Sequence, residues 1–430
     1  MGIKVWKALP LFFVIAIGCA PGNRIRKSLI QSEKEFNEHI GFLLYDPGSH
    51  KSLADFNSDK YFTPASNTKI FTFYTSLQVL GDSIPGLRYV VQNDSLIFWG
   101  TGDPSFLYEE VSKSDRVFQF LKTHPSNLYY SKSGFDATAL GPGWAWDDYP
   151  YGYSAERSAL PLYGNTVIFT DTITGNVKAS PSYFQSHLVR GSRKEKPELE
   201  RGFDDNQFTF SPGIDSMKFT RVFPFKTSAE MTVALLSDTL KRKVALVDIP
   251  PPTSVNVVYS LPSDSLYKVM MQESDNFIAE QLLLMCAGVI SDTLKSEIAI
   301  EHAKENFLFD LPDEPQWVDG SGLSRYNLFT PRSVVRLWQK IYEKMPRERL
   351  FPLLATGGVT GTIKNAYKGD TPYIYGKTGT LSNNHCLSGY ILTKKNRLLI
   401  FSYMNNNYTV PTRKIRSQME AVLKEVHEKY

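Results

Sequence analysis

The stretch Ile40-Gly41-Phe42-Leu43-Leu44-Tyr45, followed by Asp46-Pro47-Gly48-Ser49, decides the fold, because it predicts a strand that runs into a tight turn. A helix is predicted before it over residues 28–38, and a returning strand after it over residues 53–56. The other end of the chain predicts three strands and a closing helix, at residues 373–380, 387–392, 398–404 and 411–429. A helix–strand–strand start and a three-strand–helix finish imply that the two chain ends build one sheet with helices over it.

The segment between the two ends has a different character. From about residue 84 to residue 255, short alternating stretches are separated by Gly, Pro and Asp, which predicts a β-rich insert with long loops. We therefore predict an α+β protein. Residues 20–85 and 256–430 are expected to form the main domain, and residues 86–255 one or more inserted domains.

The composition is that of a globular protein, with 430 residues of which 42% are hydrophobic and 21% charged. This length allows two or three domains, each with its own core. The 48 Lys and Arg residues against 44 Asp and Glu residues give a net charge of +4, and the basic residues are scattered. Nothing in this pattern demands a nucleic-acid partner, so none is expected.

The first nineteen residues have the features of a bacterial secretion signal. Lys4 and Lys7 precede an apolar run, which ends in Ala16-Ile17-Gly18-Cys19. Small residues followed by Cys resemble a lipobox, in which Cys19 is diacylated and becomes the new N-terminus. The alternative is a soluble secreted protein cut near Ala20. No other segment has 18 uninterrupted apolar residues, so a lipid at Cys19 is the expected membrane attachment.

The chain has few Cys and His residues that could form disulfides or bind metal. Only Cys286 and Cys386 remain after the signal, which favours two buried thiols over a disulfide framework. The seven His residues form no metal-ligand spacing and lie near no Gly-x-Ser-x-Gly elbow. We therefore expect no metal and no cofactor, and Ser-His-Asp chemistry is poorly supported.

A different nucleophile system is present in Ser66-Asn67-Thr68-Lys69. Thr63-Pro64 precedes it as a predicted helix start, which would put Ser66 in the first turn of a buried helix. Residues three apart on a helix face the same way, so an uncharged Lys69 amine could take the Ser66 proton during attack on a carbonyl. The spacing alone is weak, because residues 265–268 also read Ser-x-x-Lys.

Two later motifs, in a fixed order after Ser66-Asn67-Thr68-Lys69, make the first motif more specific. Ser274-Asp275-Asn276 is predicted to open a second apolar helix, and Lys377-Thr378-Gly379 lies on a predicted strand followed by two more strands. Residues 382–384 and 132–134 fit the same two patterns, but without that order and context.

The ordered trio resembles the penicillin-binding protein and serine β-lactamase superfamily. Three further stretches resemble its class C low-molecular-mass penicillin-binding proteins, which are D-alanyl-D-alanine carboxypeptidases/endopeptidases: residues 100–104, residues 143–148 and Asp319-Gly320-Ser321-Gly322-Leu323-Ser324-Arg325. The resemblance implies a β-lactamase/transpeptidase-like domain, an antiparallel sheet with helices on both faces, that carries a large β-rich insert. It also implies the periplasmic side of the bacterial cell envelope as the location.

The resemblance implies a role for each motif residue. Ser66 would form the acyl-enzyme with Lys69 as the base, and Ser274 would relay a proton to the leaving amine. Asn276 would hold the substrate amide, and Lys377 would supply positive charge. In the Lys377-Thr378-Gly379-Thr380 segment, Thr378 and Thr380 would hold the terminal carboxylate, and the backbone N–H groups of Ser66 and Thr380 would form the oxyanion hole.

The expected partners are peptidoglycan stem peptides and β-lactam antibiotics, which would acylate Ser66 as substrate mimics. In the resembling family an acid near residues 143–148 contacts the side-chain amine of a diamino acid, which makes Asp148, or else Asp147, a candidate for that contact. Residues 319–322 are expected to shape the floor of the cleft. Two other functions stay open: a β-lactamase or esterase on the same scaffold, and a non-catalytic wall-binding lipoprotein.

Overall fold

The computed structural model describes residues 21–111, 115–171, 176–214 and 219–430. The predicted signal, residues 1–19 with Cys19, lies outside the described residues. Within the described part of the chain, no helix combines the length and the apolar character needed to cross a bilayer.

One six-stranded antiparallel sheet joins the two ends of the chain, as predicted. Its strand order is β14-β15-β16-β17-β1-β2. The central pairing puts Phe42 of β1 opposite Tyr403 of β17. The strands are β1 His39–Asp46, β2 Lys51–Phe56, β14 Ala355–Thr356, β15 Ile374–Leu381, β16 Asn384–Leu392 and β17 Leu398–Asn406.

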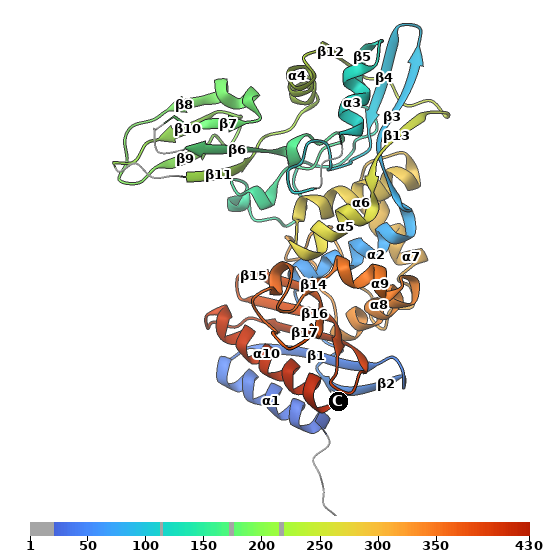
Figure 1. The fold of residues 1–430 in the computed structure, drawn as a ribbon, viewed down its shortest axis with the longest axis vertical. Helices are drawn as coiled ribbons and strands as arrows, with labels where there is room; N and C mark the ends of the chain where they lie inside the picture. The colour runs from blue at the N-terminus through green and yellow to red at the C-terminus, as the bar shows by residue number, and fades with distance from the viewer. Residues whose placement is uncertain (1–20, 112–114, 172–175, 215–218) are drawn as a thin grey trace, which may run out of the picture.

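Helices cover both faces of this sheet, which confirms the α+β fold class (Figure 1). On one face, α1 (Pro21–Phe36) and α10 (Thr412–Lys429) pack side by side. On the other face lies α8 (Pro331–Lys344). Successive side chains of a strand point to opposite faces, so Ile400 and Met404 of β17 join one core, whereas Phe401 and Tyr403 join the other.

A layer of helices lies between the sheet and the insert (Figure 1). Its main members are α2 (Lys69–Val79), α5 (Ser263–Gln272) and α6 (Asn276–Ser291), with α7 (Ser296–Asn306) and α9 (Arg347–Leu350) beside them. The core of this layer is mostly apolar, and the ring of Phe71 stacks on Phe329 at 4.0 Å between centroids. Lys69 and Glu280 are buried in the same layer. Cys286 and Cys386 are free and buried, as expected.

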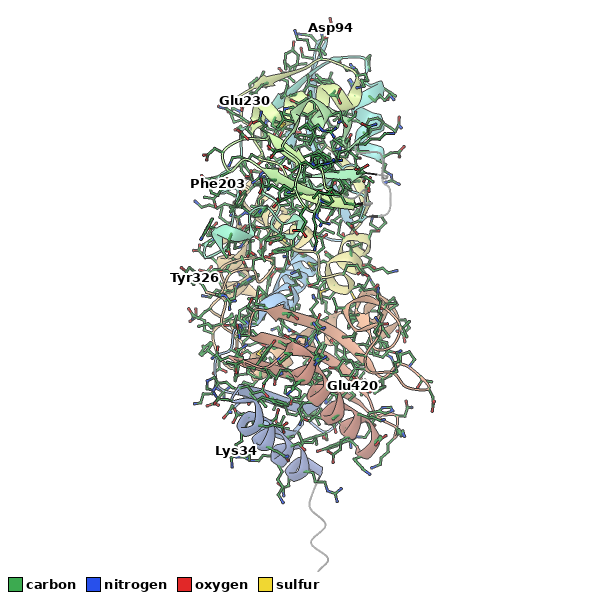
Figure 2. The ribbon with its side chains drawn as sticks, turned by 90° about the vertical axis from the view of Figure 1, so that its left-hand side faces the viewer. Lys34, Asp94, Phe203, Glu230, Tyr326 and Glu420 are labelled. Carbon is green, nitrogen blue, oxygen red and sulfur yellow. The ribbon has the colours of Figure 1, made fainter. Side chains whose placement is uncertain are left out.

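The insert forms the opposite end of an elongated molecule, and Figure 2 shows Asp94 and Glu230 at that end and Lys34 at the other. It contains a five-stranded sheet of order β12-β5-β4-β3-β13 and two three-stranded sheets, β11-β6-β7 and β8-β10-β9. Its elements are β3 Ser83–Gln92, β4 Ser95–Gly100, α3 Arg116–Thr123, β5 Asn127–Ser131, β6 Thr166–Asp171, β7 Lys178–Ser180, β8 Leu188–Arg190, β9 Glu198–Arg201, β10 Phe208–Ser211, β11 Phe219–Pro224, α4 Ala229–Leu240, β12 Val244–Val247 and β13 Asn256–Pro262.

The pairing of β13 bears on where the insert ends. We predicted residues 86–255 for the insert, but β13 begins at Asn256 and pairs with β3, so Val258 lies opposite Leu87. The antiparallel pair β3–β13 is the stem through which the chain enters and leaves the insert. The domain limits stay a prediction, and this pairing favours a boundary a few residues outside each of them.

The described residues also contain seven 3-10 helices: η1 Ala65–Thr68, η2 Trp146–Asp148, η3 Gly152–Ser154, η4 Tyr163–Asn165, η5 Ser182–His187, η6 Phe351–Leu353 and η7 Gly361–Ile363.

Candidate active site

Ser66 lies on the 3-10 turn η1, directly before α2. The prediction of an ordinary first turn capped by Thr63 was wrong, because Pro64 occupies the cap position and no side chain caps the turn. Ala65 has a φ of +47°, which is unusual for a residue with a side chain. The turn is fixed by close packing: a Cβ on Gly322 would lie 1.9 Å from the Ala65 carbonyl oxygen. Ser66 is thus held in a closely packed 3-10 helix that leads directly into α2.

Lys69 is the first residue of α2 and is fully buried. Its Nζ donates to Ser66 Oγ at 2.9 Å, to Asn276 Oδ1 at 2.6 Å and to the Ser321 carbonyl at 2.7 Å. Burial lowers the pKa of Lys69 to about 8, against the opposing effect of nearby carboxyl groups, of which Asp319 is the strongest. An amine with this pKa exchanges its proton near neutral pH.

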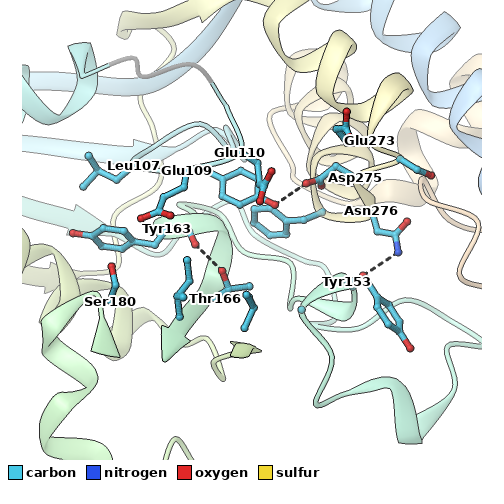
Figure 3. A pocket seen from close by; sticks show the side chains of 16 residues that line it. Leu107, Glu109, Glu110, Tyr153, Tyr163, Thr166, Ser180, Glu273, Asp275 and Asn276 are labelled. Carbon is cyan, nitrogen blue, oxygen red and sulfur yellow. Dashed lines mark hydrogen bonds between the residues drawn. The ribbon is translucent and has the colours of Figure 1, made fainter. Parts of the chain in front are cut away.

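The second motif lies between α5 and α6 and brings Asn276 to Lys69. We predicted that Ser274 opens a helix, and this was wrong. Ser274 has a φ of +66°, and α6 begins two residues later at Asn276. The helix is capped by Asp275, whose carboxylate accepts from the Ile278 N–H at 2.8 Å. Asn276 Nδ2 donates to the backbone carbonyl of Tyr153 at 3.0 Å (Figure 3).

The third motif is on β15, and it connects to the second motif through Lys377. The Nζ of this buried lysine donates to Ser274 Oγ at 2.7 Å and to the Thr378 carbonyl at 2.8 Å. Burial and the neighbouring Lys69 hold the pKa of Lys377 well below its usual range. Two buried amines therefore lie in one cluster, and each contacts a serine hydroxyl.

Gly379 brings β15 into contact with η1. A Cβ at this position would lie 2.4 Å from the Pro64 carbonyl oxygen and 2.9 Å from the Ser66 nitrogen. Only a residue without a side chain fits there, so the motif glycine is required for the strand to reach the Ser66 amide.

The side-chain hydroxyls of Thr378 and Thr380 each lie within hydrogen-bonding distance of one other side chain. The Thr378 and Thr362 Oγ1 atoms are 2.6 Å apart, and Thr380 Oγ1 is 2.8 Å from His385 Nδ1. Sequence analysis missed Thr362, which lies on the exposed side of η7. The glycine-rich stretch around it signals a loop, but nothing in it indicates contact with a strand sixteen residues later.

The loop after residue 318 does more than the floor-shaping role that we predicted, because its Ser321 carbonyl contacts Lys69. Asp319 is fully buried and accepts from four donors: Gly322 N at 2.8 Å, Ser324 N at 2.7 Å, Asn327 Nδ2 at 2.7 Å and Trp144 Nε1 at 3.0 Å. Since Trp144 belongs to the insert, this carboxylate ties the insert to the site.

A cavity of about 370 Å³ opens beside Ser274 and Asn276 and extends into the insert (Figure 3). Tyr108 lines it and donates its hydroxyl to Asp275 at 2.6 Å. Asp148 lies near this region, on η2, and accepts from the Tyr153 hydroxyl at 2.7 Å. The contact of Asp148 or Asp147 with a substrate amine stays a prediction.

The chain is similar to proteins named D-alanyl-D-alanine carboxypeptidases. A family model described as the D-Ala-D-Ala carboxypeptidase 3 (S13) family matches residues 24–426. The chain is 25% identical over 423 residues to a D-alanyl-D-alanine carboxypeptidase from an Actinomadura species. The alignment covers 86% of this chain and 78% of that protein.

Solved structures show the same fold. Penicillin binding protein 4 from Haemophilus influenzae superposes with a TM-score of 0.76 at 20% identity, covering 93% of this chain and 99% of that one. Its complex with a β-lactam gives a TM-score of 0.71 at 18% identity, covering 94% and 99%. A predatory peptidoglycan endopeptidase from Bdellovibrio bacteriovorus gives 0.53 at 14% identity, covering 91% and 92%. At these identities the likeness establishes the fold.

Proposed function

The chain belongs to the D-Ala-D-Ala carboxypeptidase 3 (S13) family, and from that premise we propose that it is a serine hydrolase of peptidoglycan. It cleaves the bond between two D-amino acids at the end of stem peptides, as a carboxypeptidase, and in cross-links, as an endopeptidase. The Actinomadura relative is named a carboxypeptidase and the Bdellovibrio neighbour an endopeptidase, which supports both activities. The observation that carries the proposal is the contact of the buried Lys69 amine with Ser66 Oγ at 2.9 Å.

In the acylation step, uncharged Lys69 takes the Ser66 proton as Oγ bonds to the substrate carbonyl carbon. With a pKa of about 8, Lys69 is uncharged in about a tenth of molecules at pH 7. The new ammonium keeps its bonds to the Asn276 side chain and the Ser321 carbonyl, so no buried charge is left without acceptors.

The carbonyl oxygen gains negative charge during the attack, and backbone N–H groups of Ser66 and Thr380 would stabilise it. The close approach of Gly379 to the Ser66 nitrogen supports this oxyanion hole. When the C–N bond breaks, the Ser274 hydroxyl gives a proton to the leaving amine and regains one from Lys377, 2.7 Å away. The proton that Lys69 took from Ser66 replaces the one that Lys377 gave, so Lys69 is uncharged again after the amine leaves. Water then attacks the ester and gives a proton to Lys69, and Lys69 returns that proton to Ser66 Oγ as the bond between the acyl carbon and Oγ breaks.

Three hydroxyl groups are suited to hold the substrate's terminal carboxylate: those of Thr378, Thr380 and Thr362. The first and third already lie 2.6 Å apart, so a carboxylate can bridge them. Asn276 would position the substrate amide, and Asp148 the amine of a diamino acid on the side toward the insert.

We propose that β-lactams acylate Ser66 and leave slowly, because the described residues of the site offer no deacylation residue beyond the motif trio. The β-lactam complex of the Haemophilus neighbour supports the acylation. Rapid turnover of nitrocefin or penicillin would instead favour the alternative of a β-lactamase or esterase.

The decisive experiment digests isolated wall fragments with the mature protein and identifies the products by mass spectrometry. Released D-alanine or separated cross-links support the proposal, and a Ser66→Ala variant should produce neither. A folded protein that releases nothing and takes no label from fluorescent penicillin would be a non-catalytic wall-binding protein instead.

We also propose that the mature protein is held on the periplasmic side of the cell envelope by a lipid on Cys19. The intact mass of the membrane-extracted protein tests this, because diacylation and removal of residues 1–18 change it by a defined amount. A Cys19→Ser variant that stays in the membrane with an unchanged mass would overturn the anchor.

A further inference from the structure

Ser321 lies between two charged side chains that belong to different helices. Its carbonyl accepts from Lys69 Nζ at 2.7 Å, and its N–H donates to Glu280 Oε1 at 2.7 Å. Glu280 is on α6, one turn after Asn276, which contacts Lys69 directly at 2.6 Å. One face of α6 therefore reaches the Lys69 amine twice, once through Asn276 and once through Glu280 and Ser321.

The peptide groups on both sides of Ser321 are fixed as well. The Gly320 carbonyl accepts from Thr72 Oγ1 at 2.7 Å, and the Gly322 N–H donates to Asp319 Oδ1 at 2.8 Å. A Cβ on Gly320 would lie 2.6 Å from the Ala279 carbonyl oxygen. The segment thus packs directly against α6, and the Ser321 carbonyl is held in place by the hydrogen bond that Glu280 accepts together with those of Thr72 and Asp319.

Glu280 shares its ion-pair partner with other acceptors. Arg157 from the insert is 3.5 Å away, and its guanidinium also donates to Ser296 Oγ at 3.1 Å and to the Thr138 carbonyl at 3.1 Å. Glu280 is 1% exposed, so water screens its charge little.

The charged groups that interact with Glu280 come from three other elements: Lys69 on α2, Asp319 in the loop and Arg157 in the insert. Asp275 and Lys377 belong to the same cluster through Lys69. Burial, then the Asp319 charge, raises the pKa of Glu280 to about 7, and Arg157 opposes that rise. The same carboxyl groups raise the pKa of Lys69, whereas burial lowers it.

We propose that Glu280 is a positioning residue for Lys69: it holds the Ser321 carbonyl on the amine and supplies negative charge that stabilises the ammonium formed when Ser66 is acylated. This inference rests on the proposed function. The proton that leaves Ser66 then arrives on a lysine whose acceptors are already in place, and whose counter-charge lies one residue behind the carbonyl.

The test is a Glu280→Gln variant, which keeps the size and the acceptor oxygen but removes the charge. Acylation of Ser66 by fluorescent penicillin is measured from pH 5 to pH 10. Without the carboxylate, burial lowers the pKa of Lys69 further, so the upper part of the acid limb, between pH 7 and pH 8 where Glu280 carries its charge, should move up to about one unit to lower pH. The plateau rate should fall roughly tenfold, because a less basic amine is a weaker base.

Two further variants separate charge from structure. Glu305→Gln removes an exposed carboxylate on α7 and should leave the profile unchanged. Glu280→Asp keeps the charge but shortens the side chain, so it should lower the plateau without moving the acid limb. If the Glu280→Gln variant does not fold, the Glu280→Asp variant still tests whether the length of this side chain matters for acylation.

Three results are decisive. A folded Glu280→Gln protein with the wild-type acid limb would overturn the inference, as would an Asp variant whose limb moves down although its charge is kept. If the wild-type protein takes no label and Ser66→Ala behaves identically, the proposed function itself fails.

Discussion

The Nζ atom of Lys69 lies 2.9 Å from the Oγ atom of Ser66, where the 3-10 turn η1 passes into α2. The two residues share a hydrogen bond across a change of backbone geometry, and both ends of the contact are fixed by other segments. Lys69 is bonded to α6 through Asn276 and to the loop after residue 318 through Ser321. The nucleophile and its base therefore depend on three segments that are far apart in the chain.

Acylation should depend on pH through Lys69. Because the amine must be uncharged and its pKa is about 8, the rate of labelling by fluorescent penicillin should rise about tenfold per pH unit below 8 and level off above it. A Lys69→Met variant should lose about 1,000-fold or more. The matched control is Lys268→Met, which changes the exposed lysine of the second Ser-x-x-Lys stretch at residues 265–268 and should label normally. A wild-type rate that does not change between pH 6 and pH 9 would contradict this role.

Gly379→Ala should block acylation while leaving the protein folded. The added methyl group would lie 2.4 Å from the Pro64 carbonyl oxygen, so β15 must move away from the Ser66 amide. Loss of one oxyanion donor reduces rates by about 100-fold or more, and that loss is expected in the labelling rate. Gly48→Ala in the β1–β2 turn is the control, since its new methyl group meets only the Asp46 side chain at 3.3 Å. Equal rates for both variants would mean that β15 does not form the oxyanion hole.

The sequence predicted those parts of the fold whose pattern is local. The hairpin at residues 40–56 and the three strands at the end follow from turn residues and alternation, and the structure joins them through β1 and β17. The order of the three motifs identified their helices and strand. The left-handed backbone of Ser274 was not predictable, because a serine before Asp and Asn reads as a helix cap.

The parts of the site that were missed depend on tertiary contact. Ser321 acts through its carbonyl, which every residue has, so no residue type signals it. Thr362 lies in a loop whose glycines allow turns in many directions, and tertiary packing, such as that of Gly361 against the Gln272 carbonyl oxygen, sets its place. Glu280 reads as one more polar position on an apolar helix.

Thr362→Val should weaken the binding of peptides that end in a free carboxylate. The variant keeps the shape but removes the hydroxyl that lies 2.6 Å from Thr378 Oγ1, so KM should rise about tenfold, the value of one hydrogen bond to a charged group. The rate of Ser66 acylation at saturating peptide should change little. Thr362→Ser restores the hydroxyl and should restore KM. A Val variant with the wild-type KM would show that the substrate carboxylate is bound elsewhere.

Glu38→Gln should stabilise the fold above neutral pH. Glu38 is buried behind β1; one oxygen accepts from Ser32 Oγ at 2.7 Å, and the other has no partner among the described residues. Burial raises its pKa from 4.5 to about 7, so between these pH values the folded protein binds more protons than the unfolded chain. The free energy of unfolding therefore falls as pH rises through that window, by ~1–2 kcal/mol once solvent screening is allowed for.

Melting temperatures at pH 5 and pH 8 measure this effect: the gain in melting temperature of the Glu38→Gln variant over wild type should be larger at pH 8. Glu35→Gln, on the exposed side of α1, should show no such difference, and a gain that is equal at both pH values would mean that Glu38 is charged in the folded protein throughout.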